Sequence, residues 1–115
     1  MLSRDRRLSS GMLQEMHQSD DVRVTRSSFF VVRRAGAESA PTRFAVIVSA
    51  KIAKTAVERN RIKRRVHGVL EDLLPRIADG SRVALYAKAA VRDTAHAAIR
   101  DDLETALSNT GVLHT

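Results

Sequence analysis

Positive charge gathers between Lys51 and Arg65, around a single asparagine. Five of the seven positions from 59 to 65 are lysine or arginine. Cations held so close together repel one another unless an anion lies opposite them. Guanidinium groups form paired hydrogen bonds with phosphate oxygens or with the edge of a guanine base. The cluster therefore predicts a polyanionic partner.

The rest of the charge is divided unevenly along the chain. Residues 1–65 hold 15 Lys or Arg against 6 Asp or Glu, a net charge of +9, whereas residues 66–115 hold 5 against 7, a net charge of −2. This division indicates one basic face, and such a face binds phosphate, either in nucleic acid or in acidic lipid. A basic, solvated surface with no specific partner is the simpler alternative, and the clustering argues against it.

The composition excludes several other classes of protein. The chain has no cysteine, which rules out disulfides, thiolate metal sites and a cysteine nucleophile. No apolar run approaches the roughly 20 residues of a membrane span, and the first residues lack the apolar segment of a signal peptide. We therefore expect a cytoplasmic protein with no membrane partner.

No catalytic constellation is visible in the sequence. The four histidines are scattered, and neither a Ser-His-Asp ordering nor a Gly-rich phosphate loop is present. His67 follows the basic cluster and could contact a nucleic acid, but we favour a solvated surface histidine. Asp101, Asp102 and Glu104 are interpreted as a solvated edge of the last helix. We expect no catalytic residue and no metal site in the protein itself.

The elements that must position the cluster follow from hydrophobic periodicity and turn residues. We predict a single α/β (α+β) domain over residues 1–115, with a four-stranded sheet and the order α-β-β-β-α-β-α. The expected helices cover residues 9–17, 56–74 and 92–108. The expected strands cover residues 21–25, 27–34, 43–49 and 82–87. Residues 1–8 are polar and basic, and we expect them to be flexible.

The long helix carries the basic cluster. Thr55 followed by Glu58 predicts a capping box, in which each side chain bonds to the other residue's backbone N–H. Helical spacing places an aliphatic stripe on one side, which must lie on the sheet, and turns Asn60, Arg61, Arg64 and Arg65 away from it. Gly68 shares this outward side. It either admits a phosphate backbone or is incidental, and we slightly favour the second.

The segment ERNRIKRR at residues 58–65, preceded by Ala56-Val57 and by a strand ending at Val48-Ser49, resembles the signature of the bacterial ribonuclease P protein subunit. The resemblance covers nearly the whole chain and is strongest over residues 43–70. It implies a two-layer sandwich related to the second domain of ribosomal protein S5. It also implies that a partner RNA, with Mg²⁺ bound mainly by that RNA, removes the 5′ leader of precursor tRNA. No small-molecule substrate is implied.

The resemblance also assigns roles to residues. The RNA-binding positions are Lys51, Lys54, Arg59, Asn60, Arg61, Lys63, Arg64 and Arg65. A cleft between the first helix and the sheet would hold the single-stranded leader, and Met12, Met16, Phe30 and Val32 are matched to it. Because the methionines stand where the family has aromatics, we expect charge and van der Waals contact there more than stacking. An RNA-binding module of ribosomal or assembly type with the same fold remains the alternative.

Overall fold

The computed structural model describes residues 1–114 and has the expected order of helices and strands. Three short 3₁₀ segments, Arg4–Arg6, Leu74–Arg76 and Ala89–Val91, accompany the main elements. The main elements are α1 (Ser10–His17), β1 (Arg23–Arg26), β2 (Phe30–Gly36), β3 (Arg43–Ile47), α2 (Ala56–Leu73), β4 (Ser81–Ala87) and α3 (His96–Asn109).

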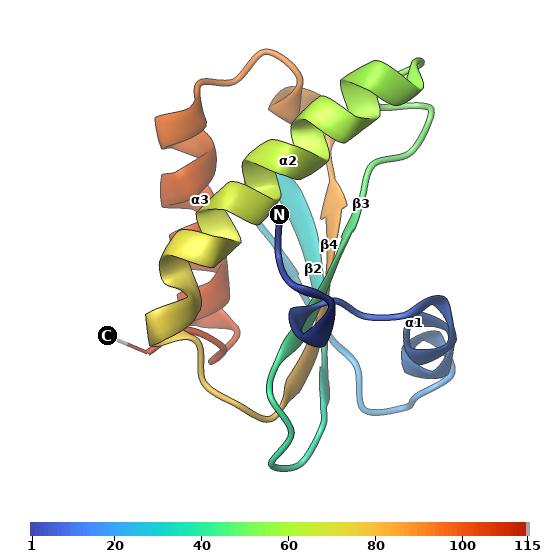
Figure 1. Ribbon diagram of the computed structural model, residues 1–115, viewed down its shortest axis with the longest axis vertical. Coiled ribbons are helices and arrows are strands. Elements are labelled where there is room, and N and C mark those ends of the chain that lie inside the picture. The colour runs from blue at the N-terminus through green and yellow to red at the C-terminus, as the bar shows by residue number, and fades with distance from the viewer. Residues whose placement is uncertain (115) are drawn as a thin grey trace.

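The four strands form one sheet in the order β1-β2-β4-β3. β1, β2 and β4 pair antiparallel, whereas β3 pairs parallel to β4, so the chain crosses over between them through α2. Figure 1 shows α2 and α3 together on one side of the sheet and α1 on the other. The sheet and the α2–α3 layer make the predicted sandwich, and α1 covers part of the opposite face.

The core lies between the sheet and the α2–α3 layer. Val66, Val69, Leu70 and Leu73 form the expected aliphatic stripe of α2, and each is at most 1% exposed. Burying each such side chain stabilises the fold by about 1.5–3 kcal/mol. This packing fixes the rotation of α2 about its axis, and with it the direction of the basic side chains.

The helix begins where the sequence predicts, but only half of the capping box forms. Oγ1 of Thr55 accepts a hydrogen bond from the Glu58 backbone N–H at 3.1 Å. Among the side-chain hydrogen bonds of residues 1–114, none returns from the Glu58 carboxylate to Thr55. The carboxylate is exposed and remains available at the surface.

The first eight residues, which we expected to be flexible, pack against the domain. Leu2 is 2% exposed and belongs to the main core. The Leu8 backbone N–H donates to the Phe44 carbonyl oxygen at 2.8 Å, and Arg7 bridges Phe44 in parallel, so the segment covers the free edge of β3. The segment has too few apolar residues to show a period, so its sequence does not predict this packing.

Asp102 is likewise no solvated edge, in contrast to our expectation. Its carboxylate accepts hydrogen bonds from the Ser27 hydroxyl at 2.7 Å, the Ser28 N–H at 3.1 Å and the Phe29 N–H at 3.0 Å. Asp102 thus ties α3 to the turn between β1 and β2. Its neighbour Asp101 is exposed, as predicted.

Candidate nucleic-acid interface

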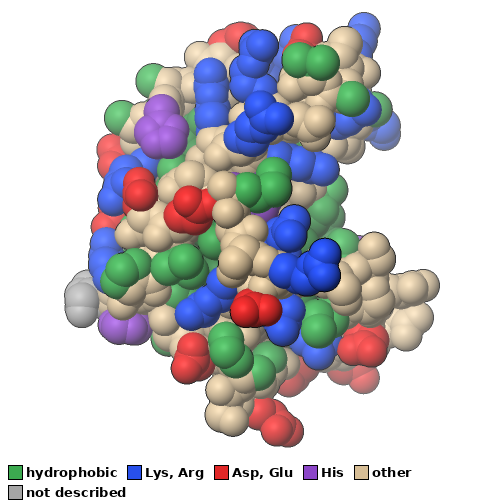
Figure 2. Space-filling model, in the orientation of Figure 1, with side chains coloured by type: hydrophobic (Ala, Val, Ile, Leu, Met, Phe, Trp, Pro, Cys, Tyr) green, Lys and Arg blue, Asp and Glu red, His purple; other side chains and the backbone are tan. Residues whose placement is uncertain are grey.

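The N-terminal half of α2 and the loop before it present a basic surface, formed by the exposed residues Lys51, Lys54, Asn60, Arg61 and Arg64. None of these cations forms an ion pair within residues 1–114, where four ion pairs are present elsewhere. Figure 2 shows blue side chains over this part of the molecule. We call these five residues the α2 basic surface. Its charge is uncompensated by the protein.

Arg59 and Arg65 differ from their neighbours because they are half-buried and bonded to the backbone. The Arg59 guanidinium donates to the carbonyl oxygens of Ala53 at 3.0 Å and Lys54 at 3.1 Å, and so orders the loop before α2. The Arg65 guanidinium donates to the Thr94 carbonyl oxygen at 3.4 Å. Both keep donors to spare, since a guanidinium has five N–H groups. Their positive charges therefore add to the α2 basic surface.

Lys63 lies apart from the other predicted cations. It is half-buried and lines a hollow of about 300 Å³ beside β3, together with Arg7, Asn60 and His67. This hollow adjoins the α2 basic surface through Asn60. The structure therefore brings all eight predicted RNA-binding residues to one end of α2, with Lys63 on the side facing the N-terminal segment.

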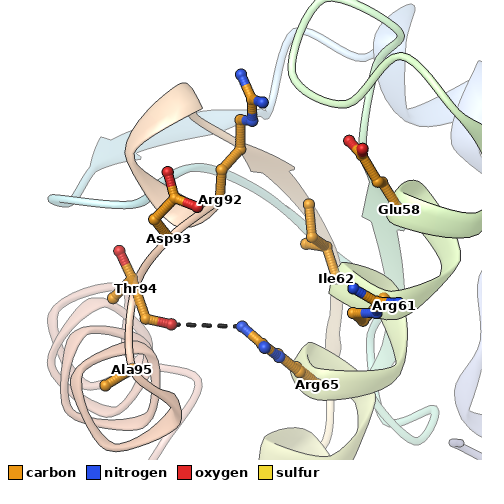
Figure 3. Close-up of a pocket in the computed structure, with 8 residues that line it drawn as sticks. All are labelled: Glu58, Arg61, Ile62, Arg65, Arg92, Asp93, Thr94 and Ala95. Carbon is orange, nitrogen blue, oxygen red and sulfur yellow. Dashed lines mark hydrogen bonds between the residues drawn. The ribbon is translucent and has the colours of Figure 1, made fainter.

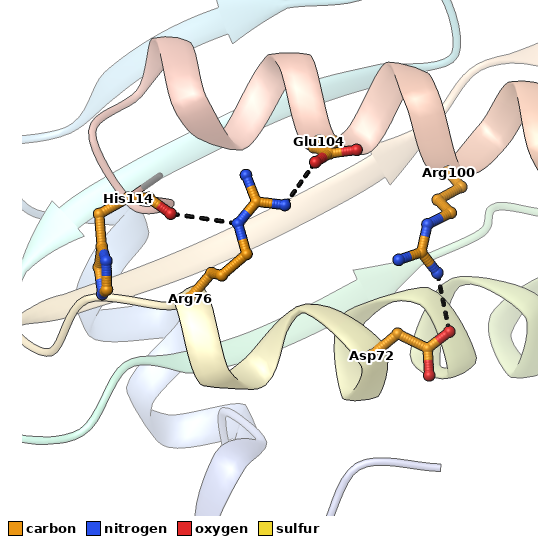
Figure 4. Close-up of polar contacts among 5 residues, drawn as sticks. All are labelled: Asp72, Arg76, Arg100, Glu104 and His114. Atoms are coloured by element: carbon orange, nitrogen blue, oxygen red, sulfur yellow. Dashed lines mark hydrogen bonds and ion pairs between the residues drawn. The ribbon is translucent and has the colours of Figure 1, made fainter.

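Charged side chains at the C-terminal end of α2 form ion pairs with α3, unlike the cations at its N-terminal end. Asp72 pairs with Arg100 of α3 at 2.9 Å, and Arg76, just past the helix, pairs with Glu104 of α3. Figure 4 shows these contacts side by side, with the Arg76 guanidinium also bonded to the His114 carbonyl oxygen at 3.2 Å. The Arg76 hydrogen bond holds the pKa of Glu104 below its ordinary value. Charge is matched within the protein here and left unmatched at the other end.

His67 is buried, which corrects our expectation of a solvated surface histidine. It is 6% exposed, and its Nδ1 accepts a hydrogen bond from the Leu2 backbone N–H at 3.3 Å. Burial, followed by the positive charge of the chain's amino terminus, lowers the pKa of the imidazole. His67 faces the N-terminal segment and exposes little of its surface to a nucleic acid.

Two of the predicted cleft residues were assigned to the wrong face of the sheet. Phe30 and Val32 are 0% exposed and lie in the core under the α2–α3 layer. Side chains alternate across a strand, so Val31 and Arg33 occupy the α1 face instead. Neither Phe30 nor Val32 can contact an RNA strand without unfolding the core.

The first helix does cover a second, smaller apolar cluster. Met16 is buried on the sheet against Ala35 and Ala84, and so acts as a structural contact. Met12 is half-buried and lines a hollow of about 500 Å³ together with Arg43 and Arg82. Of the four predicted cleft residues, Met12 alone lines a surface hollow on this side of the sheet.

An aromatic group outside the four predicted cleft residues lies on this same face. Tyr86 of β4 lines a hollow of about 400 Å³ with His17, Val31 and Arg33. The Tyr86 hydroxyl and the His17 Nε2 are 2.5 Å apart, and the Arg33 guanidinium lies 5.8 Å from the tyrosine ring centre. We call these four residues the α1-face hollow. Alternation in β4 could have revealed Tyr86, because Val83 and Leu85 face the core.

The described residues show no metal cage and no membrane helix. Within residues 1–114, no group of three His, Cys, Asp or Glu side chains lies close enough to hold a metal ion. The same residues contain no helix that is both long and apolar enough to cross a bilayer.

Comparison with known proteins identifies the family. The model of the family described as Ribonuclease P matches residues 2–111. The chain belongs to the ribonuclease P protein family. A Clavibacter michiganensis protein named "Ribonuclease P protein component" is 30% identical over 108 residues, which cover 94% of this chain and 95% of that protein. A Rippkaea orientalis protein of the same name is 41% identical, but the match spans 42% of its length. The match to the Pseudanabaena ribonuclease P protein component spans 63% of that protein's length.

Solved structures share the fold. The ribonuclease P protein of Staphylococcus aureus superimposes with a TM-score of 0.79 at 21% identity, covering 95% of this chain and 98% of that one. The ribonuclease P protein of Thermotoga maritima gives a TM-score of 0.79 at 18% identity, with 90% and 96% covered. The predicted fold class is therefore confirmed.

Proposed function

We propose that this chain is the protein subunit of a ribonuclease P ribonucleoprotein that matures the 5′ end of tRNA in the cytoplasm. The observation that carries the proposal is the unpaired charge of the α2 basic surface. A protein that keeps Arg61 and Arg64 exposed and without carboxylate partners gains from binding a polyanion, because binding releases condensed counterions. Membership of the family supports ribonuclease P RNA as the partner of this surface.

The α1-face hollow supports a second contact, to the single-stranded leader of precursor tRNA. Tyr86 offers a ring on which a base can stack, and Arg33 offers a cation beside it. Arg43 continues the positive charge along the same face, toward Met12, whereas Arg82 is paired with Glu15 of α1 at 3.0 Å. Base stacking thus joins the charge and van der Waals contact that the sequence suggested.

We assign hydrolysis to the RNA and positioning of the substrate to the protein. Hydrolysis of a phosphodiester with Mg²⁺ needs oxygen ligands arranged around the metal, and we assign these ligands to the RNA. The protein would place cations between two polyanions, the catalytic RNA and the substrate, and so reduce their repulsion. Less Mg²⁺ would then be required for the two RNAs to associate.

Reconstitution tests this proposal directly. The full chain is added to a bacterial ribonuclease P RNA and a precursor tRNA at low Mg²⁺, and mature 5′ ends are counted. We expect the protein to increase cleavage, and we expect the protein alone to cleave nothing. If the RNA is bound but cleavage does not increase, the chain is an RNA-binding module of ribosomal or assembly type.

A further inference from the structure

A groove between α2 and the segment before α3 adjoins the α2 basic surface and shares Arg61 with it. Its volume is about 560 Å³, within the size range of small-ligand sites. Figure 3 shows Glu58, Arg61 and Arg65 of α2 on one wall, with Arg92 and Asp93 on the other. The hydrogen bond from Arg65 to Thr94 joins the two walls.

The lining of the groove combines three guanidinium groups with two carboxylates. Within residues 1–114, none of the three arginines forms an ion pair with Glu58 or Asp93. The Glu58 carboxylate is free because the return bond of the capping box is not made, and Asp93 is exposed. Donors and acceptors therefore both remain available to a ligand.

This mixture selects among possible ligands. A phosphate group alone would be attracted by the arginines and repelled by Glu58 and Asp93. An unstacked guanine satisfies both sets of groups. Its O6 and N7 accept a bidentate pair from an arginine, and its N1–H and exocyclic amine donate to a carboxylate. An adenine offers an amine where guanine has O6, so it fits the same arginine less well.

We propose that this groove binds a single unstacked guanosine of an RNA strand, with Arg92 reading the base from outside the basic cluster. The flanking phosphates of that strand lie on Arg61 and Arg64, which neighbour the groove on α2. The proposal deepens the RNA-binding role of α2 and rests on it. It adds base selectivity to a surface that otherwise recognises charge.

The test uses the full chain and short RNA probes. Fluorescence anisotropy compares a labelled pentauridine whose central base is guanine, adenine or hypoxanthine. We expect the guanine probe to bind about fivefold or more tighter than the adenine probe. The hypoxanthine probe lacks the exocyclic amine and should lie between them. The ratio should persist at higher salt, because all probes have the same phosphates.

Variants locate the selectivity in the groove. Arg92→Ala should bring the guanine and adenine probes to equal affinity, because it removes the side chain that reads the base. Arg92 is exposed, so its loss should leave the fold intact. Arg23→Ala, which removes an exposed arginine of β1, should weaken all probes alike and preserve the ratio. Equal affinities for guanine and adenine in the unmodified protein would overturn the proposal, as would loss of the ratio in Arg23→Ala.

Two further measurements distinguish an RNA strand from a free nucleotide as the source of the guanine, and the groove assignment from the subunit role. Guanosine monophosphate should bind more weakly than the oligonucleotide, because it lacks the flanking phosphates. If it binds as tightly, the groove serves a free nucleotide and the assignment to an RNA strand is wrong. Absence of selectivity alongside salt-dependent binding of ribonuclease P RNA would defeat the groove while leaving the subunit role in place.

Discussion

The backbone N–H of Leu2 donates to Nδ1 of His67 at 3.3 Å, which fastens the start of the chain to the middle of α2. The two residues are 65 positions apart, and both are buried. An imidazole nitrogen can accept this hydrogen bond only while it is unprotonated. The attachment of the N-terminal segment is thereby linked to the protonation of one histidine.

We expect stability to fall as the pH is lowered through the range in which histidine titrates. Burial lowers the pKa of His67 below its ordinary value of 6.5, so the unfolded chain takes up this proton at a higher pH than the folded one. The stability that the folded state gains from an unprotonated His67 is present above pH 6.5 and declines as the pH falls below it. Urea unfolding at pH 7.5 and at about 5.5 measures the difference, because most carboxylates titrate below that range. His67→Gln should reduce the pH dependence, and an unchanged dependence would contradict the assignment.

Replacing Arg61 and Arg64 by alanine should weaken binding to ribonuclease P RNA and leave the fold intact. Both residues are exposed and contact no carboxylate within residues 1–114. The slope of log K against log salt should become shallower by about 2. The matched control removes Arg4 and Arg23, which are exposed outside the α2 basic surface. Equal losses in the two double variants would show that net charge, and not this surface, determines affinity.

Tyr86→Ala should weaken binding of precursor tRNA by roughly 5- to 100-fold, the effect of losing one stacked base. Binding of mature tRNA, which lacks the leader, should be unaffected. Tyr86→Phe keeps the ring and removes only the hydroxyl that bonds to His17, so it should behave like the unmodified protein. Titrations with the two tRNAs in the presence of the catalytic RNA provide the measurement. A similar loss for both tRNAs would place Tyr86 outside the leader contact.

Phe30→Ala should destabilise the protein by about 3–5 kcal/mol, because it leaves a cavity in the core. Val31→Ala, one position along on the opposite face, should cost much less. The free energy of unfolding in urea compares the two variants. A small loss for Phe30→Ala would return this residue to the surface role that the sequence suggested.

Asp102→Ala should cost about 1–3 kcal/mol, since it removes the acceptor of three hydrogen bonds from the turn between β1 and β2. Asp101→Ala removes the same charge from an exposed neighbour and should be nearly neutral. Thermal unfolding distinguishes the two. Equal melting temperatures for both variants would mean that the turn is held by its other contacts.

The strength of the sequence signal decided which predictions were correct. In α2, helical periodicity, a cap and a charge cluster all agree, so the rotation of the helix and the direction of Arg61 and Arg64 were predictable. In the run from Phe29 to Val32 every residue is apolar, so alternation cannot tell which side faces the core. The face was therefore assigned by resemblance, and the assignment of Phe30 and Val32 to the cleft was wrong.

Contacts between distant segments left no local signal. Leu2 and His67 carry no pattern that pairs them, and the carboxylate of Asp102 is like any other until α3 is placed beside the β1–β2 turn. The groove lined by Arg65 and Arg92 joins residues from two elements whose distance depends on how α2 and α3 pack. Such sites follow from tertiary structure alone.

The unmatched charge at one end of α2 also affects the protein when no RNA is present. Repulsion among these side chains favours an expanded chain, and it is strongest in dilute buffer, where screening is weak. Salt should therefore have opposite effects on the free and the RNA-bound protein: it should stabilise the free protein and weaken its binding to nucleic acid. The guanidinium groups that favour RNA binding thus also lower the conformational stability of the free protein.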